Sequence, residues 1–197
     1  DENIDPNLID IWLTPERRQK IPNLLKRRTY ISQTSCGICG KKLIEDLYQA
    51  ITPVEDDFKM EIDQVFKCMK LLSTKQAVYP KTRGSHAALI LDGNGELMSF
   101  SEDVGRHNAL DKAIGKLFME ESLHMAKILV MSSRISYELV QKAARARLPV
   151  IISKSRPTAL AANMLKSLNI TMTCAFEPSE LILFSGSKRI ETTDAHG

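Results

Sequence analysis

Apolar residues recur at helical spacing between Asp56 and Ser73, which predicts a helix over that range. A short apolar run from Ala87 to Leu91 follows, and then a second one from Leu97 to Phe100. The four residues at 92–95, Asp-Gly-Asn-Gly, separate these two runs. Because such residues between apolar runs favour a tight turn, the pattern predicts a β-hairpin.

The second half of the chain alternates between short apolar runs and helical patterns. Strands are expected at 128–131, 150–152, 170–176 and 181–184, and helices at 108–119, 137–146 and 159–168. Strands that alternate with helices are typical of a mixed or parallel sheet with helices on its faces. The fold class predicted is therefore α/β, in which ligands bind beyond the carboxyl ends of strands.

Composition narrows the class of protein further. The chain has 197 residues, of which 43% are hydrophobic and 26% charged, so it is long enough to bury a core without disulfides. A net charge of +3 is too small to indicate a nucleic acid or an anionic membrane as the main partner. No apolar run approaches the roughly 20 residues that a membrane span needs. Without a secretory leader, the four cysteines are expected to be reduced and the protein cytoplasmic.

The sharpest local feature is the pair of thiols in Cys36-Gly37-Ile38-Cys39, in which a glycine follows each cysteine. Two intervening residues let both sulfurs reach one metal ion or each other. Four interpretations stay open at this point: half of a zinc site, a thioredoxin-type redox pair, a sulfur carrier with an exposed thiolate, and a structural pair. The zinc interpretation needs two further ligands, and no second Cys-x-x-Cys occurs.

Three other titratable side chains stand alone in apolar surroundings. Cys68 lies in the apolar stripe of the first predicted helix, and Cys174 lies in a predicted strand. Both are expected to be buried small hydrophobic residues. His86 stands beside Ala87 at the entrance of the hairpin, where a core histidine is more typical than a metal ligand.

Polar side chains are concentrated at residues 102–108, Glu-Asp-Val-Gly-Arg-His-Asn, between the hairpin and a helix. Asp103, Arg106 and His107 could form a charge network, in which His107 relays protons near neutral pH. The alternative is an elaborate helix cap, in which the helix dipole favours Glu102 and Asp103. The residues alone do not separate these two interpretations.

Two loops rich in serine and arginine follow consecutive predicted strands, at residues 132–134 and 153–158. Serine hydroxyls, backbone N–H groups and the guanidinium of Arg134 or Arg156 would make a phosphate-binding cradle. The Gly-rich fingerprints of dinucleotide-binding and P-loop proteins are absent from the sequence. The residues therefore suggest sulfur or redox chemistry on a phosphorylated ligand, without identifying that ligand.

Four stretches taken together resemble the formate dehydrogenase accessory sulfurtransferase family, often called FdhD, over roughly residues 27 to 176. They are the dithiol segment 35–40, the segment Gly84 to Leu89, the eleven residues from Glu102 to Lys112, and the stretch that runs from Ser132 to Glu138 and on to 157–161. The resemblance implies a cytidine-deaminase-like mixed sheet flanked by helices, and a homodimer. The zinc signature of the deaminases is not reproduced, because no His-x-Glu occurs, so no metal is expected.

The same resemblance implies a sulfur carrier. A cysteine desulfurase would hand sulfane sulfur to Cys36, with Cys39 as its partner, and the sulfur would pass to the bis-guanine-dinucleotide molybdenum cofactor that formate dehydrogenase requires. Asp103, Arg106, His107 and His86 would support the site. The expected cofactor contacts are Ser133, Arg134, Ser155, Thr158, Ala175, Phe176, Glu177, Pro178 and Ser179.

The chain departs from the family in two places. The family's C-terminal motif, roughly Gly-Phe-x-Arg-Gly, reads Ala-Phe-Glu-Pro-Ser at 175–179, so Phe176 fits and the Gly and Arg do not. Family members carry a longer region before the dithiol, so the chain is expected to begin inside it. The domain prediction is a truncated N-terminal segment at 1–40 and an α/β domain at 41–197. Two rival interpretations are a chaperone for cofactor or apo-enzyme, whose dithiol loop docks a partner, and a zinc-bound structural module.

Overall fold

The computed structural model describes residues 12–19, 51–176 and 180–191. The chain divides into two compact units, residues 1–45 and 46–197. In the first unit, residues 15–19 are helical, and the backbone N–H of Arg18 donates to the carbonyl of Thr14 at 3.0 Å. The predicted boundary at residue 40 lies outside the described residues and stays a prediction.

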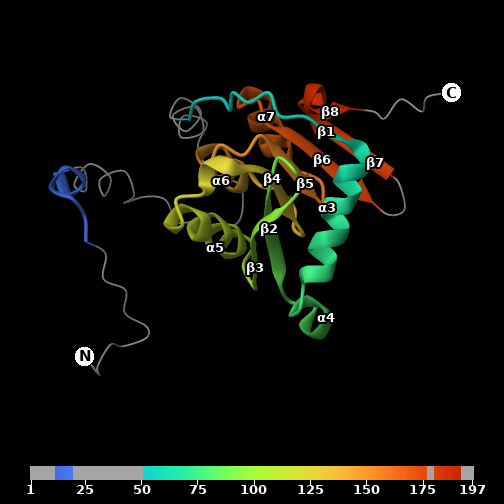
Figure 1. Cartoon of the computed structure of the whole chain (residues 1–197), viewed down its shortest axis with the longest axis horizontal. Helices are drawn as coiled ribbons and strands as arrows, with labels where there is room; N and C mark the ends of the chain where they lie inside the picture. Colours follow the sequence, from blue (N-terminus) through green and yellow to red (C-terminus); the bar gives the residue numbers. More distant parts are fainter. Residues whose placement is uncertain (1–11, 20–50, 177–179, 192–197) are drawn as a thin grey trace. The chain divides into compact units, whose positions relative to one another are not determined.

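In the second unit, six strands form one mixed sheet in the order β3-β2-β4-β5-β6-β7 (Figure 1). The pairs β4–β5 and β5–β6 are parallel, and the pairs β2–β3, β2–β4 and β6–β7 are antiparallel. The strands of this sheet are β2 (His86–Asp92), β3 (Leu97–Asp103), β4 (Ala126–Met131), β5 (Val150–Ser153), β6 (Thr171–Phe176) and β7 (Glu180–Ser185). The α/β class with a mixed sheet is confirmed, whereas the likeness to cytidine deaminases stays a prediction.

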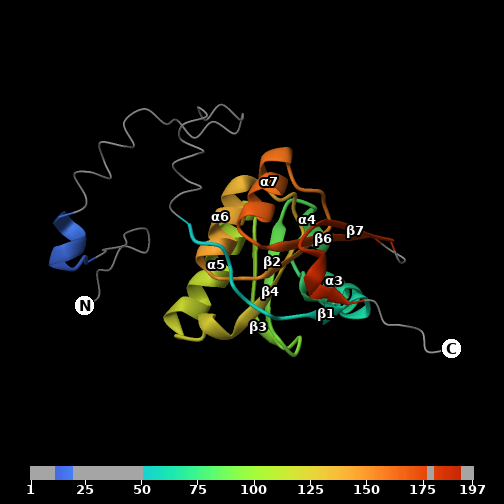
Figure 2. The ribbon, with the colours of Figure 1, turned by 90° about the horizontal axis from the view of Figure 1, so that it is seen from above.

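Helices cover both faces of this sheet, and each face has its own apolar core. The helices α5 (Arg106–Met119), α6 (Tyr137–Arg145) and α7 (Ala159–Ser167) pack on one face, and α3 (Ile62–Lys75) packs on the other (Figure 2). The central strands β4 and β5 contribute fully buried side chains to both cores, which is typical of parallel strands covered on both sides. Such a sheet leaves its strand ends as the exposed place for a site.

The helix predicted to begin at Asp56 begins six residues later, at Ile62. Asp56 instead accepts a hydrogen bond from the backbone N–H of Phe58 at 2.8 Å and pairs with Lys127 at 2.7 Å. The following residues form β1 (Met60–Glu61), which pairs in parallel with β8 (Ile190–Glu191). Tertiary pairing thus overrides the helical spacing of the first few apolar residues.

The C-terminal segment is tied to the rest of the fold by a buried arginine. Arg189, in the 3₁₀ turn η2 (Ser187–Arg189), is 1% exposed. Its guanidinium donates to the carbonyls of Asn169 at 2.8 Å, Asp56 at 3.0 Å and Val54 at 3.4 Å. Because an unpaired buried charge is costly, these carbonyls satisfy the group in place of a carboxylate.

The other predicted elements agree with the structure to within a few residues. The hairpin at 87–100 corresponds to β2 and β3, and its turn carries Gly95 at φ +84°. The short helix α4 (Tyr79–Thr82) and the 3₁₀ turn η1 (Leu123–Met125) were not predicted. A four-residue helix is too short to show a periodic apolar pattern, and α4 has no buried residue.

Candidate functional site

Two neighbouring loops at the carboxyl ends of β4 and β5 are joined by one buried hydroxyl. Ser153, which is fully buried, places its Oγ 2.7 Å from the carbonyl oxygen of Ser133 and 2.8 Å from that of Ser155. The same Oγ accepts from the backbone N–H of Ser155 at 3.0 Å. Farther along, Ile135 and Pro157 form a parallel bridge. The loops after β4 and β5 are therefore held together, as a two-loop platform, by backbone groups and one neutral hydroxyl, without their charged side chains.

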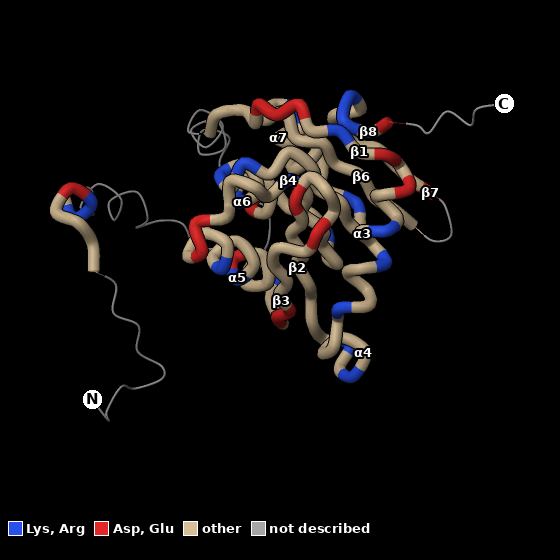
Figure 3. Tube along the Cα trace, in the orientation of Figure 1, with Lys and Arg blue, Asp and Glu red and all other residues tan. Residues whose placement is uncertain are grey.

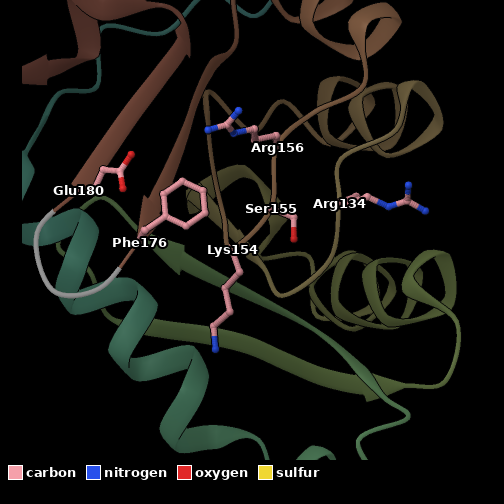
Figure 4. Close-up of a pocket in the computed structure, with 6 residues that line it drawn as sticks. All are labelled: Arg134, Lys154, Ser155, Arg156, Phe176 and Glu180. Carbon is pink, nitrogen blue, oxygen red and sulfur yellow. The ribbon is translucent and has the colours of Figure 1, made fainter.

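A pocket of about 450 Å³ opens at this platform, beside the end of β6 and the start of β7 (Figure 4). Its lining includes three cations, one carboxylate and an aromatic ring, the residues being Arg134, Lys154, Ser155, Arg156, Phe176 and Glu180. In Figure 4 the Arg134 side chain extends away from the Phe176 ring. None of the ion pairs among the described residues involves these charged groups. An excess of unpaired cations beside an aromatic ring is suited to a phosphorylated ligand with a planar ring.

The expected cofactor contacts divide between this pocket and the framework around it. Arg134, Ser155 and Phe176 line the pocket. Thr158 instead forms the N-cap of α7, where its hydroxyl accepts from the backbone N–H of Ala161 at 3.3 Å. Ser133, at 3% exposed, directs its Oγ to the carbonyl of Arg134. Ala175 is 7% exposed, and residues 177–179 lie outside the described residues.

The two cysteines that the structure describes are buried, as predicted, and both are poor nucleophiles. Cys174 is fully buried, and its thiol donates to the carbonyl of Ser155 at 3.1 Å. Burial raises the pKa of Cys68 and of Cys174 to about 11. Since the thiolate is the reactive form, neither residue is suited to carry sulfur at neutral pH. The predicted carriers, Cys36 and Cys39, lie outside the described residues.

Glu102 holds a different helix from the one that the sequence suggested. Its carboxylate accepts from the backbone N–H groups of residues 77, 78 and 79 at 2.7, 2.9 and 3.0 Å, and from the hydroxyl of Ser85 at 3.0 Å. Burial raises the pKa of Glu102, but these four hydrogen bonds together lower it by more, so the pKa lies below its ordinary value. The interpretation of Glu102 as a cap of α5 is therefore wrong, because β3 directs it toward α4.

Asp103 contacts the start of α5 by accepting from its N-cap residue, Gly105, and among the described residues it forms no ion pair with Arg106 or His107. Its carboxylate pairs with Lys112 at 2.5 Å and accepts from the backbone N–H of Gly105 at 2.8 Å. The pairing with Lys112, followed by the Gly105 bond, lowers the pKa of Asp103 to about 2. The cap interpretation of this residue agrees with the contacts, whereas the charge-network interpretation does not.

Arg106, the first residue of α5, influences two histidines, His86 at the start of β2 and its own neighbour His107. Burial and, second, the charge of Arg106 lower the pKa of His86. The same two effects are the largest causes of the lowered pKa of His107. Both shifts favour the neutral form of the imidazole. Both rings are partly exposed, and the expectation of a core position for His86 is wrong, since β2 begins there at the edge of the core.

Sequence reasoning did not single out Lys154 or Glu180 as site residues. Lys154 lies in a loop that the sequence had marked, but Glu180 reaches the pocket only because β7 folds back on β6. Among the described residues, no group of three His, Cys, Asp or Glu side chains could hold a metal ion. Within the same ranges, no helix is long and apolar enough to cross a membrane.

Comparison with known proteins points to one family. The model of the FdhD/NarQ family matches residues 2–191. A protein of Bordetella bronchiseptica named sulfur carrier protein FdhD is 35% identical over 165 residues, which cover 84% of this chain and 60% of that protein. A protein of the same name from Saccharolobus solfataricus is 30% identical over 190 residues, with 96% and 70% covered. The chain thus spans about 60% of the length of the first of these relatives.

A solved structure has the same fold. It is the crystal structure of a Desulfotalea psychrophila protein described as a formate dehydrogenase accessory protein, and it matches with a TM-score of 0.66 and 24% identity. The match covers 77% of this chain and 62% of that one. The family model spans nearly the whole sequence and the segments at 84–89 and 102–112 lie within it, so the chain belongs to the FdhD/NarQ family.

Proposed function

We propose that this protein is a sulfur carrier in the maturation of formate dehydrogenase. It accepts sulfane sulfur from a cysteine desulfurase as a persulfide on Cys36 and delivers it to the bis-guanine-dinucleotide molybdenum cofactor. The observation that carries the proposal is membership of a family whose similar relatives are named sulfur carrier protein FdhD. The homodimer remains a prediction of the resemblance, and the cytoplasmic location remains a prediction from the sequence.

The chemistry of the four cysteines supports this assignment. With Cys68 and Cys174 buried as thiols, Cys36 and Cys39 are the thiols left for sulfur transfer. The Cys36 thiolate attacks the terminal sulfur of the desulfurase persulfide, which releases the desulfurase thiolate and leaves a persulfide on Cys36. The Cys39 thiolate then attacks the inner sulfur of that persulfide, so that a Cys36–Cys39 disulfide forms and hydrosulfide leaves. A dithiol reductant restores the two thiols.

The pocket at the strand ends supports the second half of the proposal. The cofactor, which is the substrate here, carries guanine nucleotide arms with phosphates. Lys154 and Arg156, which form no ion pair with a described residue, offer cations for the phosphates, and Phe176 offers a ring surface for a base. No fixed metal is part of the proposal.

The test is the intact mass of the protein after incubation with a cysteine desulfurase and L-cysteine. A gain of sulfur that a reductant reverses is expected in the native chain and in Cys174→Ser, and its absence is expected in Cys36→Ser. If the folded native chain gains no sulfur, the carrier assignment is wrong.

The chaperone interpretation makes the opposite prediction for the same variant. Under that interpretation, Cys36→Ser still activates formate dehydrogenase, because the dithiol loop only docks a partner. Under the carrier proposal, Cys36→Ser abolishes activation, and Cys39→Ser prevents release of sulfide in a single turnover while the persulfide still forms.

A further inference from the structure

The short helix α4 is held in place without a core of its own. None of its residues is buried, yet the Glu102 carboxylate accepts from the backbone N–H groups of residues 77–79 at 2.7, 2.9 and 3.0 Å. Pro80 restricts the backbone in its first turn, and the Arg83 guanidinium lies over the Tyr79 ring, 5.3 Å from the ring centre. Because burial does not account for this investment in hydrogen bonds, we interpret α4 as a fixed element of the protein surface.

The surface around α4 is basic over a long stretch of the chain. Residues 64–91 contain no aspartate or glutamate. Their five lysine and arginine side chains are all exposed, namely Lys67, Lys70, Lys75, Lys81 and Arg83. None of the ion pairs among the described residues includes these side chains, and Figure 3 shows the basic positions on α3 and α4. The carboxylate that contacts α4, Glu102, is already occupied by four hydrogen bonds. These five cations form what we call the α3–α4 surface.

The α3–α4 surface also has an apolar centre. Val78, the residue before α4, is 46% exposed, and Pro80 is exposed as well. An apolar centre within a polar rim is the usual anatomy of a protein–protein interface. Interfaces with nucleic acids are more polar than this. The surface therefore favours an acidic protein as its partner over a nucleic acid.

This surface lies at the carboxyl edge of the sheet, where the pocket also opens. From Arg83 the chain leads into β2, and the backbone N–H of Ala87 donates to the Ser132 hydroxyl at 2.7 Å. Ser132 follows β4 and begins the loop that carries the pocket residue Arg134. A protein that takes up a ligand from the pocket approaches this edge of the sheet, and the α3–α4 surface is there to meet it.

We propose that the α3–α4 surface is the docking site for cofactor-free formate dehydrogenase, which presents an acidic patch to it. The inference rests on the proposed function and adds to it the place where the acceptor of the cofactor binds. The five cations steer the encounter, because complementary charge raises the association rate. Val78 becomes buried at the centre of the contact, and the fixed backbone of α4 reduces the entropy that is lost on binding.

The experiment measures the association and dissociation rates of the full chain with the cofactor-free formate dehydrogenase of the same organism, by biolayer interferometry at low and at high salt. The charge reversal Lys75→Glu/Lys81→Glu is expected to slow association about tenfold at low salt, and most of this difference disappears at high salt. Lys166→Glu/Lys188→Glu makes the same change of net charge at exposed lysines of α7 and η2. This matched control is expected to associate as the native chain does.

A second variant tests the apolar centre. Val78→Ser is expected to raise the dissociation rate about fivefold and to leave the association rate close to the native value. Because Val78 is half exposed and lies outside both cores, the unfolding midpoint in urea should change little. Both test variants should still gain sulfur on Cys36.

Three results would overturn the docking inference. The first is a native chain that binds no cofactor-free enzyme, or a folded Lys75→Glu/Lys81→Glu variant that associates as fast as the native chain. The second is a single-stranded oligonucleotide that binds as tightly as the enzyme and is weakened by the same factor, which would indicate a general polyanion site. The third is a double variant that keeps the enzyme but loses sulfur loading, which would assign the surface to the desulfurase. The proposed function fails separately, when the folded native chain gains no sulfur.

Discussion

The carboxyl edge of the sheet carries charged residues at both of its ends, and the two ends use them in opposite ways. At the β2–β3 end, Glu102 accepts four hydrogen bonds, and Asp103 is bound to Lys112 and to the start of α5. At the β5–β6 end, Lys154 and Arg156 line a pocket without an ion pair to any described residue. The acidic positions at the end of β3 and the basic positions around α3 and α4 are visible in Figure 3.

The difference shows how to distinguish polar residues that stabilise the fold from polar residues that can bind a ligand. The segment 102–107 is dense in polar residues, yet its two carboxylates are occupied by the fold itself. The loop after β5 is less conspicuous in the sequence. Its cations, Lys154 and Arg156, form no ion pair with a described residue and can contact a ligand. A polar group without an internal partner beside a cavity is therefore a better sign of binding than a high density of polar residues.

The largest expected effect is on binding at the β5–β6 end. The double variant Lys154→Gln/Arg156→Gln is expected to weaken GDP and pyrophosphate about 100-fold, because two charge-assisted contacts are lost. Its unfolding midpoint in urea should stay at the native value, since neither cation has an ion pair with a described residue to lose. Lys166→Gln, on the exposed face of α7, is the control. A double variant that unfolds easily would show that these cations are structural.

The next effect is on stability at the β2–β3 end. Glu102→Gln is expected to lower the free energy of unfolding by about 2 kcal/mol, because an amide cannot accept from all four donors. Since the pKa of Glu102 is lowered in the fold, the stabilisation is present above its ordinary value of 4.5 and is lost as pH falls below it. Urea unfolding of the native chain and of the variant, at neutral and acid pH, measures both.

GDP binding by the Glu102→Gln variant tests whether the β2–β3 end and the β5–β6 end of the sheet are independent. The variant should bind GDP as the native chain does at a temperature where both are folded. A large loss of affinity in the folded variant would mean that Glu102 also shapes the pocket, which would remove the distinction between the two ends.

A smaller effect is expected from the neutral hydroxyl that joins the pocket loops. Ser153→Ala is expected to cost about 1 kcal/mol of unfolding free energy, because the Ser155 N–H loses its acceptor. The variant should also weaken GDP by a few-fold, because the loops that place Arg156 lose their link. Thr173→Ala, on the neighbouring buried strand, tests whether any buried hydroxyl has the same effect on binding.

The smallest effect is expected at Asp103, which lies at the protein surface. Asp103→Asn should lower stability slightly, because the pairing with Lys112 is lost. With a folded pKa of about 2 against an ordinary 3.8, the stabilisation is complete above 3.8 and disappears as pH falls toward 2. Lys112→Gln should lose less stability and keep a weaker pH dependence in urea unfolding, because Asp103 still accepts from the Gly105 N–H and from the Asn108 amide. If Lys112→Gln loses as much stability as Asp103→Asn, the pairing with Lys112 alone carries the effect.

The sequence predicted the elements of the α/β unit well, and it was weaker on what side chains contact. The hairpin and the later helices follow from apolar periodicity, which is a local property. The helix start at Ile62 was missed because Asp56 and Met60 take partners more than 70 residues away, Lys127 and Ile190. Glu102 was assigned to the nearer helix for the same reason, since no local pattern shows that a strand directs it toward residues 77–79.

By itself, the sequence determined the periodic elements, the absence of dinucleotide and P-loop fingerprints, and the family segments that make Cys36 and Cys39 the predicted carriers. The tertiary structure decided which of the polar residues are already occupied. It placed Glu180 opposite Phe176, and it left Lys154 and Arg156 without an ion pair among the described residues. The physical reason is that hydrogen bonds and ion pairs depend on distances of a few ångströms between residues far apart in the chain. Such distances exist only once the sheet has brought its strand ends together.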